Sequence, residues 1–457
     1  MTTKKDKSQI VAIIMMIFLF GMISFVTNLA SPMGDVLKNQ FKVDNWVGTL
    51  GVFANFIAYA VMGIPSGILL QKRGYKKTAL IAIAVGIIGV GIQTLSGTIS
   101  SSTAMGVYLL GAFIAGFSMC LLNTVVNPML NTLGGGGNKG NQLIQIGGTF
   151  NSLCGTSVIV LTGILLPNIK KAEIAQVQPL MFAALAIFAL AFIVISLASI
   201  PEKKTLGAPV AEKSQYSALS FRHFLLGAIG IFVYVGIEVG IPNVLQKWLQ
   251  NPHLDVLGIT TNGGNAEAIA ASVAGTYWFL MLIGRLVGAS IASKVSTKSM
   301  LAAVSSLGLV FVLFAMVGPE ISVKFPVFYE RDSVTDAFSL GGTAQVPLGA
   351  ALLVLCGLCT SIMWGGIFNL AVEGLGKYTE KASGIFMTLV CGGGILTLLQ
   401  NFIIDKTDII TVVVEGKEEQ MGTGYQASYW VIIAGLAYLL YYALVGSKNV
   451  NTDVPVE

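Results

Sequence analysis

Two carboxylates lie inside long apolar stretches of this sequence, where a charged side chain is costly to keep. Glu238 lies in the middle of IGIFVYVGIEVGIPNVL with no opposite charge beside it, and Asp35 follows a Pro and a Gly near the end of another apolar stretch. A carboxyl group in such a place can exchange a proton or hold Na⁺. The alternatives are a hydrogen-bonding role between helices for Glu238 and a solvated helix-end carboxylate for Asp35.

Uncharged polar side chains gather in two further apolar stretches. Asn123 and Asn127 are four residues apart and therefore share one helical face. Side-chain amides both donate and accept hydrogen bonds, as a polyhydroxyl ligand requires. The candidate ligand-binding residues include two tryptophans, which can stack on the C–H face of a sugar or serve in packing alone: Asn123, Asn127, Gln145, Asn151, Trp278 and Trp364.

A third group of candidates lies at the ends of apolar stretches. Arg285 is expected to snorkel or to form an interhelical salt bridge, and Glu373 to join a charge network at a cytoplasmic gate. A short basic loop carries the remaining residues of this predicted gate and motif, which together are Gly67, Lys72, Arg73, Gly74, Lys76, Arg285 and Glu373.

The elements that position these residues follow from composition. Of 457 residues, 54% are hydrophobic and 11% charged, whereas soluble domains carry roughly 25% charged residues. The chain is therefore expected to be an all-α polytopic membrane protein. Its net charge of +5 is dispersed, which argues against nucleic acid as a partner. The five cysteines all lie in apolar stretches, so no disulfide framework, metal site or cofactor is expected.

Twelve apolar stretches are long enough to cross a bilayer. They centre on residues 10–36, 45–71, 78–98, 104–131, 142–166, 177–199, 221–248, 266–292, 299–317, 346–371, 382–404 and 425–446. The polar stretch 201–220 separates six spans from six. We therefore predict an N-terminal six-helix bundle (1–200), a cytoplasmic linker (201–220) and a C-terminal six-helix bundle (221–457). The first span is expected to be retained rather than cleaved as a signal peptide.

Charge and an internal repeat support this organisation. Lys and Arg are more frequent in the segments that are cytoplasmic when both termini are cytoplasmic. GIPSGILLQKRGYKK (63–77) aligns with GRLVGASIASKVSTK (284–298), which favours two parallel, pseudo-symmetric halves and alternating access between them. A Walker motif GxxxxGK[ST] is missing from the sequence, so transport would use an ion gradient or the substrate gradient.

The loop GILLQKRGYKK (67–77) resembles the signature between helices 2 and 3 of the major facilitator superfamily. A more particular resemblance is to the fucose permease branch of sugar:proton symporters. It rests on LLNTVVNPMLNTLG (121–134), GGTFNSLCG (147–155), FVYVGIEVG (232–240), LIGRLVG (282–288) and SGIFMTLVCGGGILT (383–397).

This resemblance implies twelve helices in two bundles and uptake of a neutral monosaccharide with a proton. Asp35 matches a carboxylate on helix 1 of that branch and Asn151 a polar residue on helix 5. The branch's helix 4 carboxylate is Asn123 here, and a nearby helix 5 Gln is Gly148. Glu238 stands where the branch has an amide, so the titrating group is expected on helix 7 instead of helix 4.

Taken together, these patterns predict a secondary active transporter, not an enzyme, in a bacterial inner membrane. It would take up a hexose, deoxyhexose or small glycoside with a cation, H⁺ being the expected one, as a monomer in the lipid bilayer. Asp35 and Glu238 are the candidate ion-coupling residues. A Na⁺-coupled symporter, a sugar uniporter or exporter, and a membrane sugar sensor without transport are the alternatives.

Overall fold

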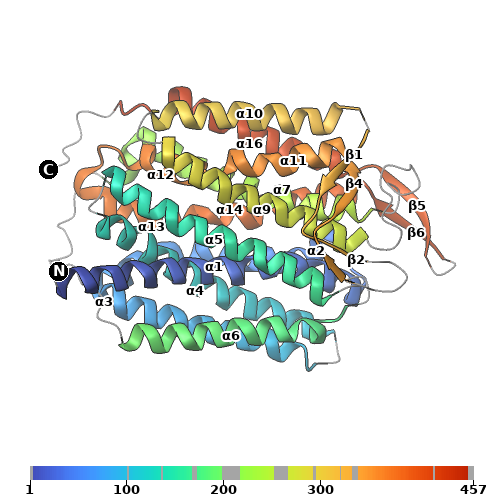
Figure 1. Ribbon diagram of the computed structural model, residues 1–457, viewed down its shortest axis with the longest axis horizontal. Coiled ribbons are helices and arrows are strands. Elements are labelled where there is room, and N and C mark those ends of the chain that lie inside the picture. Colours follow the sequence, from blue (N-terminus) through green and yellow to red (C-terminus); the bar gives the residue numbers. More distant parts are fainter. Residues whose placement is uncertain are drawn as a thin grey trace.

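The computed structural model describes most of the chain. The described residues are 4–99, 102–134, 137–166, 172–197, 217–251, 266–291, 295–319, 321–331, 338–414 and 417–450. Of the predicted linker, residues 201–216 lie outside this set. The described part is mostly helical, as the sequence predicts, and long helices run side by side along one axis (Figure 1).

The first half of the chain contributes long helices that group together in Figure 1, where α1, α3, α4 and α6 lie along one side of the bundle. Apolar residues on nearly every face make these helices suited to lipid. They are α1 (Lys4–Phe41), α2 (Asn45–Gly48), α3 (Leu50–Ser96), α4 (Thr103–Leu133), α5 (Gly137–Leu165) and α6 (Ile174–Leu197).

The second half contributes the opposite side of the bundle, where α10, α11, α12 and α16 lie (Figure 1). Several of its membrane segments are interrupted by short turns or 3₁₀ helices. The elements are η2 (Ala218–Ser220), α7 (Arg222–Leu249), α9 (Ala266–Ile291), α10 (Thr297–Val317), α11 (Leu348–Thr360), α12 (Met363–Val372), η3 (Gly376–Tyr378), α13 (Thr379–Thr388), η4 (Leu389–Cys391), α14 (Gly392–Lys406), α15 (Tyr425–Ser428), α16 (Trp430–Tyr441) and η5 (Tyr442–Gly446).

Three antiparallel two-stranded sheets correct the all-α prediction. They lie in connections between membrane helices, at the end of the bundle opposite the start of α1 (Figure 1). Their strands are too short to stand out from loops in sequence. β1 (Ser322–Pro326) pairs with β4 (Thr343–Pro347), β2 (Tyr329–Arg331) with β3 (Phe338–Leu340), and β5 (Ile409–Val414) with β6 (Lys417–Gly422). We call this the hairpin end.

Among the described residues, eleven helices are long and apolar enough to cross a membrane. One of them, α3, has 47 residues and is two helices joined at a kink, where Gly74 has φ 77°. A straight helix of that length would be about 70 Å long, more than twice the hydrocarbon thickness of a bilayer. The predicted span 45–71 covers α2 and the part of α3 before Gly74, and the predicted span 78–98 begins in the part of α3 after it.

The outer surface of the bundle is apolar. On α6, for example, Phe182, Leu190 and Ile193 are exposed, whereas Phe188 is fully buried against the bundle. So many exposed large apolar side chains are unfavourable in water and suit a helix that faces lipid.

Glycines let helices from the two halves approach closely. A Cβ atom at Gly63 on α3 would clash with the Thr388 side chain and backbone on α13, and a Cβ at Gly67 would lie 3.7 Å from the Cα of Gly384. Small residues at such crossings bring backbones together without a hydrophobic driving force. This contact fixes how α3 and α13 lie beside the cavity described next.

Candidate functional site

A large cavity lies between the two halves, with an empty volume of about 1140 Å³ that includes its opening. Its lining comes from α1, α3, α4 and α5 on one side and from α7, α9, α12 and η4 on the other. Most of the sequence-predicted ligand-binding and coupling residues line this cavity, namely Asn123, Gln145, Asn151, Glu238, Trp278 and Trp364.

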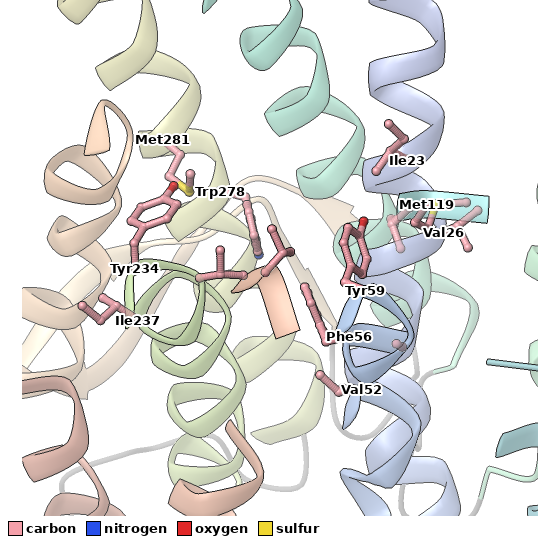
Figure 2. Packing of buried hydrophobic residues seen from close by; sticks show 14 of the residues in the cluster. Ile23, Val26, Val52, Phe56, Tyr59, Met119, Tyr234, Ile237, Trp278 and Met281 are labelled. Atoms are coloured by element: carbon pink, nitrogen blue, oxygen red, sulfur yellow. The ribbon is translucent and has the colours of Figure 1, made fainter. Parts of the chain in front are cut away.

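Aromatic rings face this cavity from both halves. Figure 2 shows Trp278 on one side and Phe56 and Tyr59 on the other, and all three line the cavity. Asn123 Nδ2 donates to the Tyr59 hydroxyl at 2.9 Å, and Asn151 Nδ2 donates to the Phe20 carbonyl at 2.8 Å. The amide oxygens of both residues are thereby oriented by contacts within the first half.

Glu238 meets an opposite charge that its own segment lacks. Arg285 Nη2 lies 3.5 Å from Glu238 Oε1, and the two side chains are 8% and 14% exposed respectively. This is the interhelical salt bridge expected for Arg285, between α9 and α7. Arg285 lines the cavity, however, so its position does not support the expected place at a cytoplasmic gate.

Arg285 also connects the two halves of the chain. Its Nη1 donates to the Gly148 carbonyl and, at 2.8 Å, to the Ser152 hydroxyl, both on α5. Its Nε donates to the Ser361 carbonyl at 3.4 Å. A Cβ atom at Gly148 would lie 3.3 Å from Arg285 Cδ, so glycine at 148 leaves room for the guanidinium.

Asn127 lies in a second, smaller cavity of about 430 Å³. Asn123 and Trp364 line both cavities and therefore form part of the wall between them. Asn127 Nδ2 donates to the Asn123 carbonyl at 3.0 Å, while its buried Oδ1 has no hydrogen-bond partner.

Asp35 does not line the central cavity but is connected to it. Gln246, which does line the cavity, donates from Nε2 to Asp35 Oδ2 at 3.3 Å, and Gln250 donates to the same oxygen at 3.4 Å. Asp35 is 4% exposed, so the interpretation as a solvated helix-end carboxylate is wrong.

A buried lysine on α7 extends this polar region toward the hairpin end. Lys247 Nζ donates to the Thr49 hydroxyl at 2.9 Å, to Asn401 Oδ1 at 2.5 Å and to the Asn45 carbonyl at 3.5 Å. Asn45 Nδ2 in turn donates to Asp405 Oδ1 at 2.6 Å. These contacts tie α2 and the start of α3 to α7 and α14.

A second chain of amides joins the same helices. Asn401 Nδ2 donates to Asn243 Oδ1 at 3.0 Å, and Asn243 Nδ2 donates to the Ser31 hydroxyl on α1 at 3.0 Å. We call the whole group the hairpin-end network; its members are Ser31, Asp35, Asn45, Thr49, Asn243, Gln246, Lys247, Asn401 and Asp405.

Apart from Asp35, the residues of this network are not among the candidates that the sequence predicts. Lys247 lies in the last turn of the predicted span 221–248, where a lysine is expected to reach the membrane surface rather than to be buried. One signal was available: Asn243 and Lys247 are four residues apart, on one face of a helix that is otherwise apolar.

The remaining residues of the predicted gate and motif lie away from the central cavity. Lys72 and Arg73 are exposed beside Gly74, and Lys76 Nζ donates to the Ser196 carbonyl on α6 at 2.8 Å. The Glu373 carbonyl accepts from His223 Nε2 at 2.8 Å. Gly67 lies at the crossing of α3 and α13. A role of these residues in a cytoplasmic gate stays a prediction.

This fold, a bundle of membrane-spanning helices in two groups with a polar cavity between them, is that of a multi-pass membrane transporter family. The chain belongs to the Major Facilitator Superfamily, whose pattern matches residues 11–398. The family predicted from the motifs is therefore confirmed, and proteins of this family are transporters and not enzymes.

Among curated proteins, the chain is 27% identical over 454 residues to the "Glucose/galactose transporter" of Brucella abortus, covering 98% of this chain and 97% of that one. It is 24% identical over 431 residues to the "L-fucose-proton symporter" of Escherichia coli, covering 88% and 89%. The predicted resemblance to the fucose permease branch is confirmed by this match.

Solved structures support the fold. The crystal structure of FucP in the outward conformation matches with a TM-score of 0.69 and 21% identity, covering 97% of this chain and all of the other. The nucleoside transporter NupG matches with a TM-score of 0.60 and 15% identity over 96% of this chain.

Proposed function

We propose that this chain is a secondary active transporter that carries a neutral sugar into the cell together with H⁺. The observation that carries the proposal is the central cavity, which places side-chain amides and aromatic rings from both halves around one space. The cavity, about 1140 Å³ including its opening, is of the size class of small-molecule binding sites, which supports a hexose or a small glycoside as the ligand. The relatives named as glucose/galactose and L-fucose transporters support a sugar as the substrate.

The proposed architecture has twelve spans, because α3 supplies two of them on either side of Gly74. Residues 1–200 and 221–457 form two six-helix halves joined by the linker 201–220, with both termini in the cytoplasm. The hairpin end then faces the outside of the inner membrane. The protein works as a monomer, since the cavity lies between two halves of a single chain.

The direction of opening follows from the hairpin-end network. Its hydrogen bonds join α1, α2 and α3 to α7 and α14 and hold the two halves together at that end. The second cavity, on the far side of Asn123 and Trp364, offers the sugar a way toward the cytoplasm. In alternating access, the change to the form open at the hairpin end would break this network. The same change would close the passage between the two cavities.

Glu238 and Asp35 are the proposed coupling residues. Each carboxylate faces nitrogen donors, Arg285 for Glu238 and two glutamine amides for Asp35. A Na⁺ site needs several converging oxygen atoms instead. The surroundings therefore favour proton exchange over Na⁺ binding at both positions. Gln246 connects the sugar cavity to Asp35 and provides a route by which a bound sugar could influence that carboxylate.

Uptake of radiolabelled glucose, galactose, fucose and a disaccharide into proteoliposomes tests the proposal, with an inward H⁺ gradient, an inward Na⁺ gradient or neither. We expect concentrative uptake of one sugar under the H⁺ gradient. Accumulation under the Na⁺ gradient would identify Na⁺ as the coupling ion. Equilibration of the sugar without accumulation would indicate a uniporter. Binding without any flux in either direction would contradict transport and favour a sensor.

Replacing Asn123 by Ala is expected to weaken sugar binding by about tenfold, the usual effect of losing one hydrogen bond of about 1.4 kcal/mol. Asn123 lines both cavities and donates to Tyr59 on α3, so the substitution removes an amide from the ligand cavity together with one hydrogen bond between α4 and α3. Isothermal titration of the purified variant measures the change. Gln178→Ala is the matched control, since Gln178 on α6 donates to the Thr94 carbonyl and lines neither of these two cavities. Unchanged affinity would remove Asn123 from the site.

A further inference from the structure

We infer that the Glu238–Arg285 ion pair makes the cavity select neutral sugars against hexuronates, with Glu238 acting as the residue that excludes the anionic sugar. The inference rests on the proposed sugar site. Of the described residues that line the central cavity, Glu238 and Arg285 are the two charged ones, and their charges cancel while Glu238 is ionised.

The ion pair leaves the guanidinium little capacity for another anion. Arg285 has five N–H groups. Nε and Nη1 donate to Ser361, Gly148 and Ser152, and Nη2 faces the Glu238 carboxylate. A hexuronate that approached Arg285 would have to displace Glu238, and its own carboxylate would lie against that of Glu238.

The other groups around Glu238 do not supply a second cation. Its titratable neighbours on α7 and α9 are Tyr234 and Tyr277, which are neutral phenols. Lys247 lies nine residues further along α7 and is engaged by oxygen atoms of the hairpin-end network. Arg285 is therefore the cation available to an anionic ligand in this cavity.

Removing the charge of Glu238 should reverse the preference. Glu238→Gln frees Arg285 Nη2 in a site shielded from water, where a charge-assisted hydrogen bond from a guanidinium N–H to a carboxylate is short and strong. The variant is then expected to bind a hexuronate through its C6 carboxylate while its pyranose ring keeps the amides and aromatic rings of the cavity. Removing both charges, as in Glu238→Gln/Arg285→Gln, should abolish this gain.

The experiment measures binding of D-glucose, D-galactose, D-glucuronate and D-galacturonate to purified full-length protein, by titration calorimetry and by thermal shift. At a pH high enough to keep Glu238 ionised, we expect wild type to bind a neutral hexose and neither hexuronate. Glu238→Gln should bind one hexuronate at least about tenfold more tightly than wild type does. Glu173→Gln, which changes an exposed carboxylate at the start of α6, is the matched control and should behave as wild type.

A second variant covers the case in which Glu238→Gln is too unstable to purify, since it leaves a buried charge unpaired. Arg285→Gln leaves the carboxylate alone and should instead gain affinity for protonated D-glucosamine. Wild type that binds hexuronate as tightly as hexose, or variants that gain neither charged sugar, would overturn the inference and leave the proposed function standing. Failure of wild type to bind any neutral sugar would contradict the proposed function itself.

Discussion

Glu238→Gln protein in proteoliposomes is expected to exchange sugar across the membrane but not to accumulate it. With one H⁺ per sugar, a gradient of one pH unit drives about tenfold accumulation, because one pH unit corresponds to about 1.4 kcal/mol. Glutamine keeps the size and hydrogen-bonding capacity of glutamate but cannot carry the proton. The accumulation ratio should therefore fall from about ten to about one, while counterflow of labelled sugar persists.

Two further variants are measured beside Glu238→Gln: Asp35→Asn and the control Glu173→Gln. Glu173 is exposed and lies outside the cavity, so its substitution should leave accumulation intact. Asp35 is hydrogen-bonded to Gln246 and Gln250, and its substitution tests the second coupling carboxylate. Undiminished accumulation by Glu238→Gln together with loss in Asp35→Asn would assign coupling to Asp35 alone.

Glu238 shows how far sequence alone could go. An isolated carboxylate in an apolar helix is conspicuous because burying a charge is costly, so the residue could be selected without a structure. Its partner could not, because Arg285 lies on another helix and no local pattern connects positions 238 and 285. The charge balance of the cavity, on which the selectivity inference depends, therefore emerged only from the packing of α7 against α9.

The two amides on α4 show a second limit of prediction from sequence. Helical periodicity placed Asn123 and Asn127 on one face correctly, since four residues make about one turn. In the structure that face spans the wall between two cavities, so the two residues contact different spaces, with Asn123 in both and Asn127 in the smaller. Periodicity within a helix does not reveal where neighbouring helices narrow the space between them.

Span counting from apolar stretches succeeded where helices are separated by polar loops. It could not foresee that positive φ at Gly74 joins two spans in one kinked element, or that connections at the hairpin end form small sheets. Nor does the sequence show that Lys247, at the end of the predicted span 221–248, is buried. That lysine is 5% exposed, and its oxygen partners come from residues 154 to 202 positions away in sequence.

Lys247→Met should shift the protein toward a form that is open at the hairpin end. The ammonium group is the one member of the network that contacts Asn45, Thr49 and Asn401 together, so it joins three segments of the chain. Methionine retains the length and apolar stem but none of these hydrogen bonds. Losing about 1.5–3 kcal/mol of charge-assisted hydrogen bonding from one conformation changes the ratio of the two forms by a factor on the order of ten to a hundred.

Accessibility of the central cavity measures this shift. Thr27 lines the cavity from α1, and a Thr27→Cys reporter can be labelled by a membrane-impermeant thiol reagent added to the outside. Labelling should be at least several-fold faster when Lys247→Met is combined with the reporter, and the maximal rate of uptake should fall because the form open to the cytoplasm is less populated. Lys406→Met is the matched control, since Lys406 is exposed at the end of α14.

The two readouts together separate a gate from a merely structural contact. If Lys247 only stabilised the fold, its loss would lower thermal stability and transport without selectively speeding labelling from one side. Equal labelling rates with and without Lys247→Met would contradict the assignment of the hairpin-end network as the outer closure. A saturating sugar stabilises the form that it binds best. If it reverses the faster labelling, sugar binding and closure at the hairpin end are coupled through one conformational equilibrium.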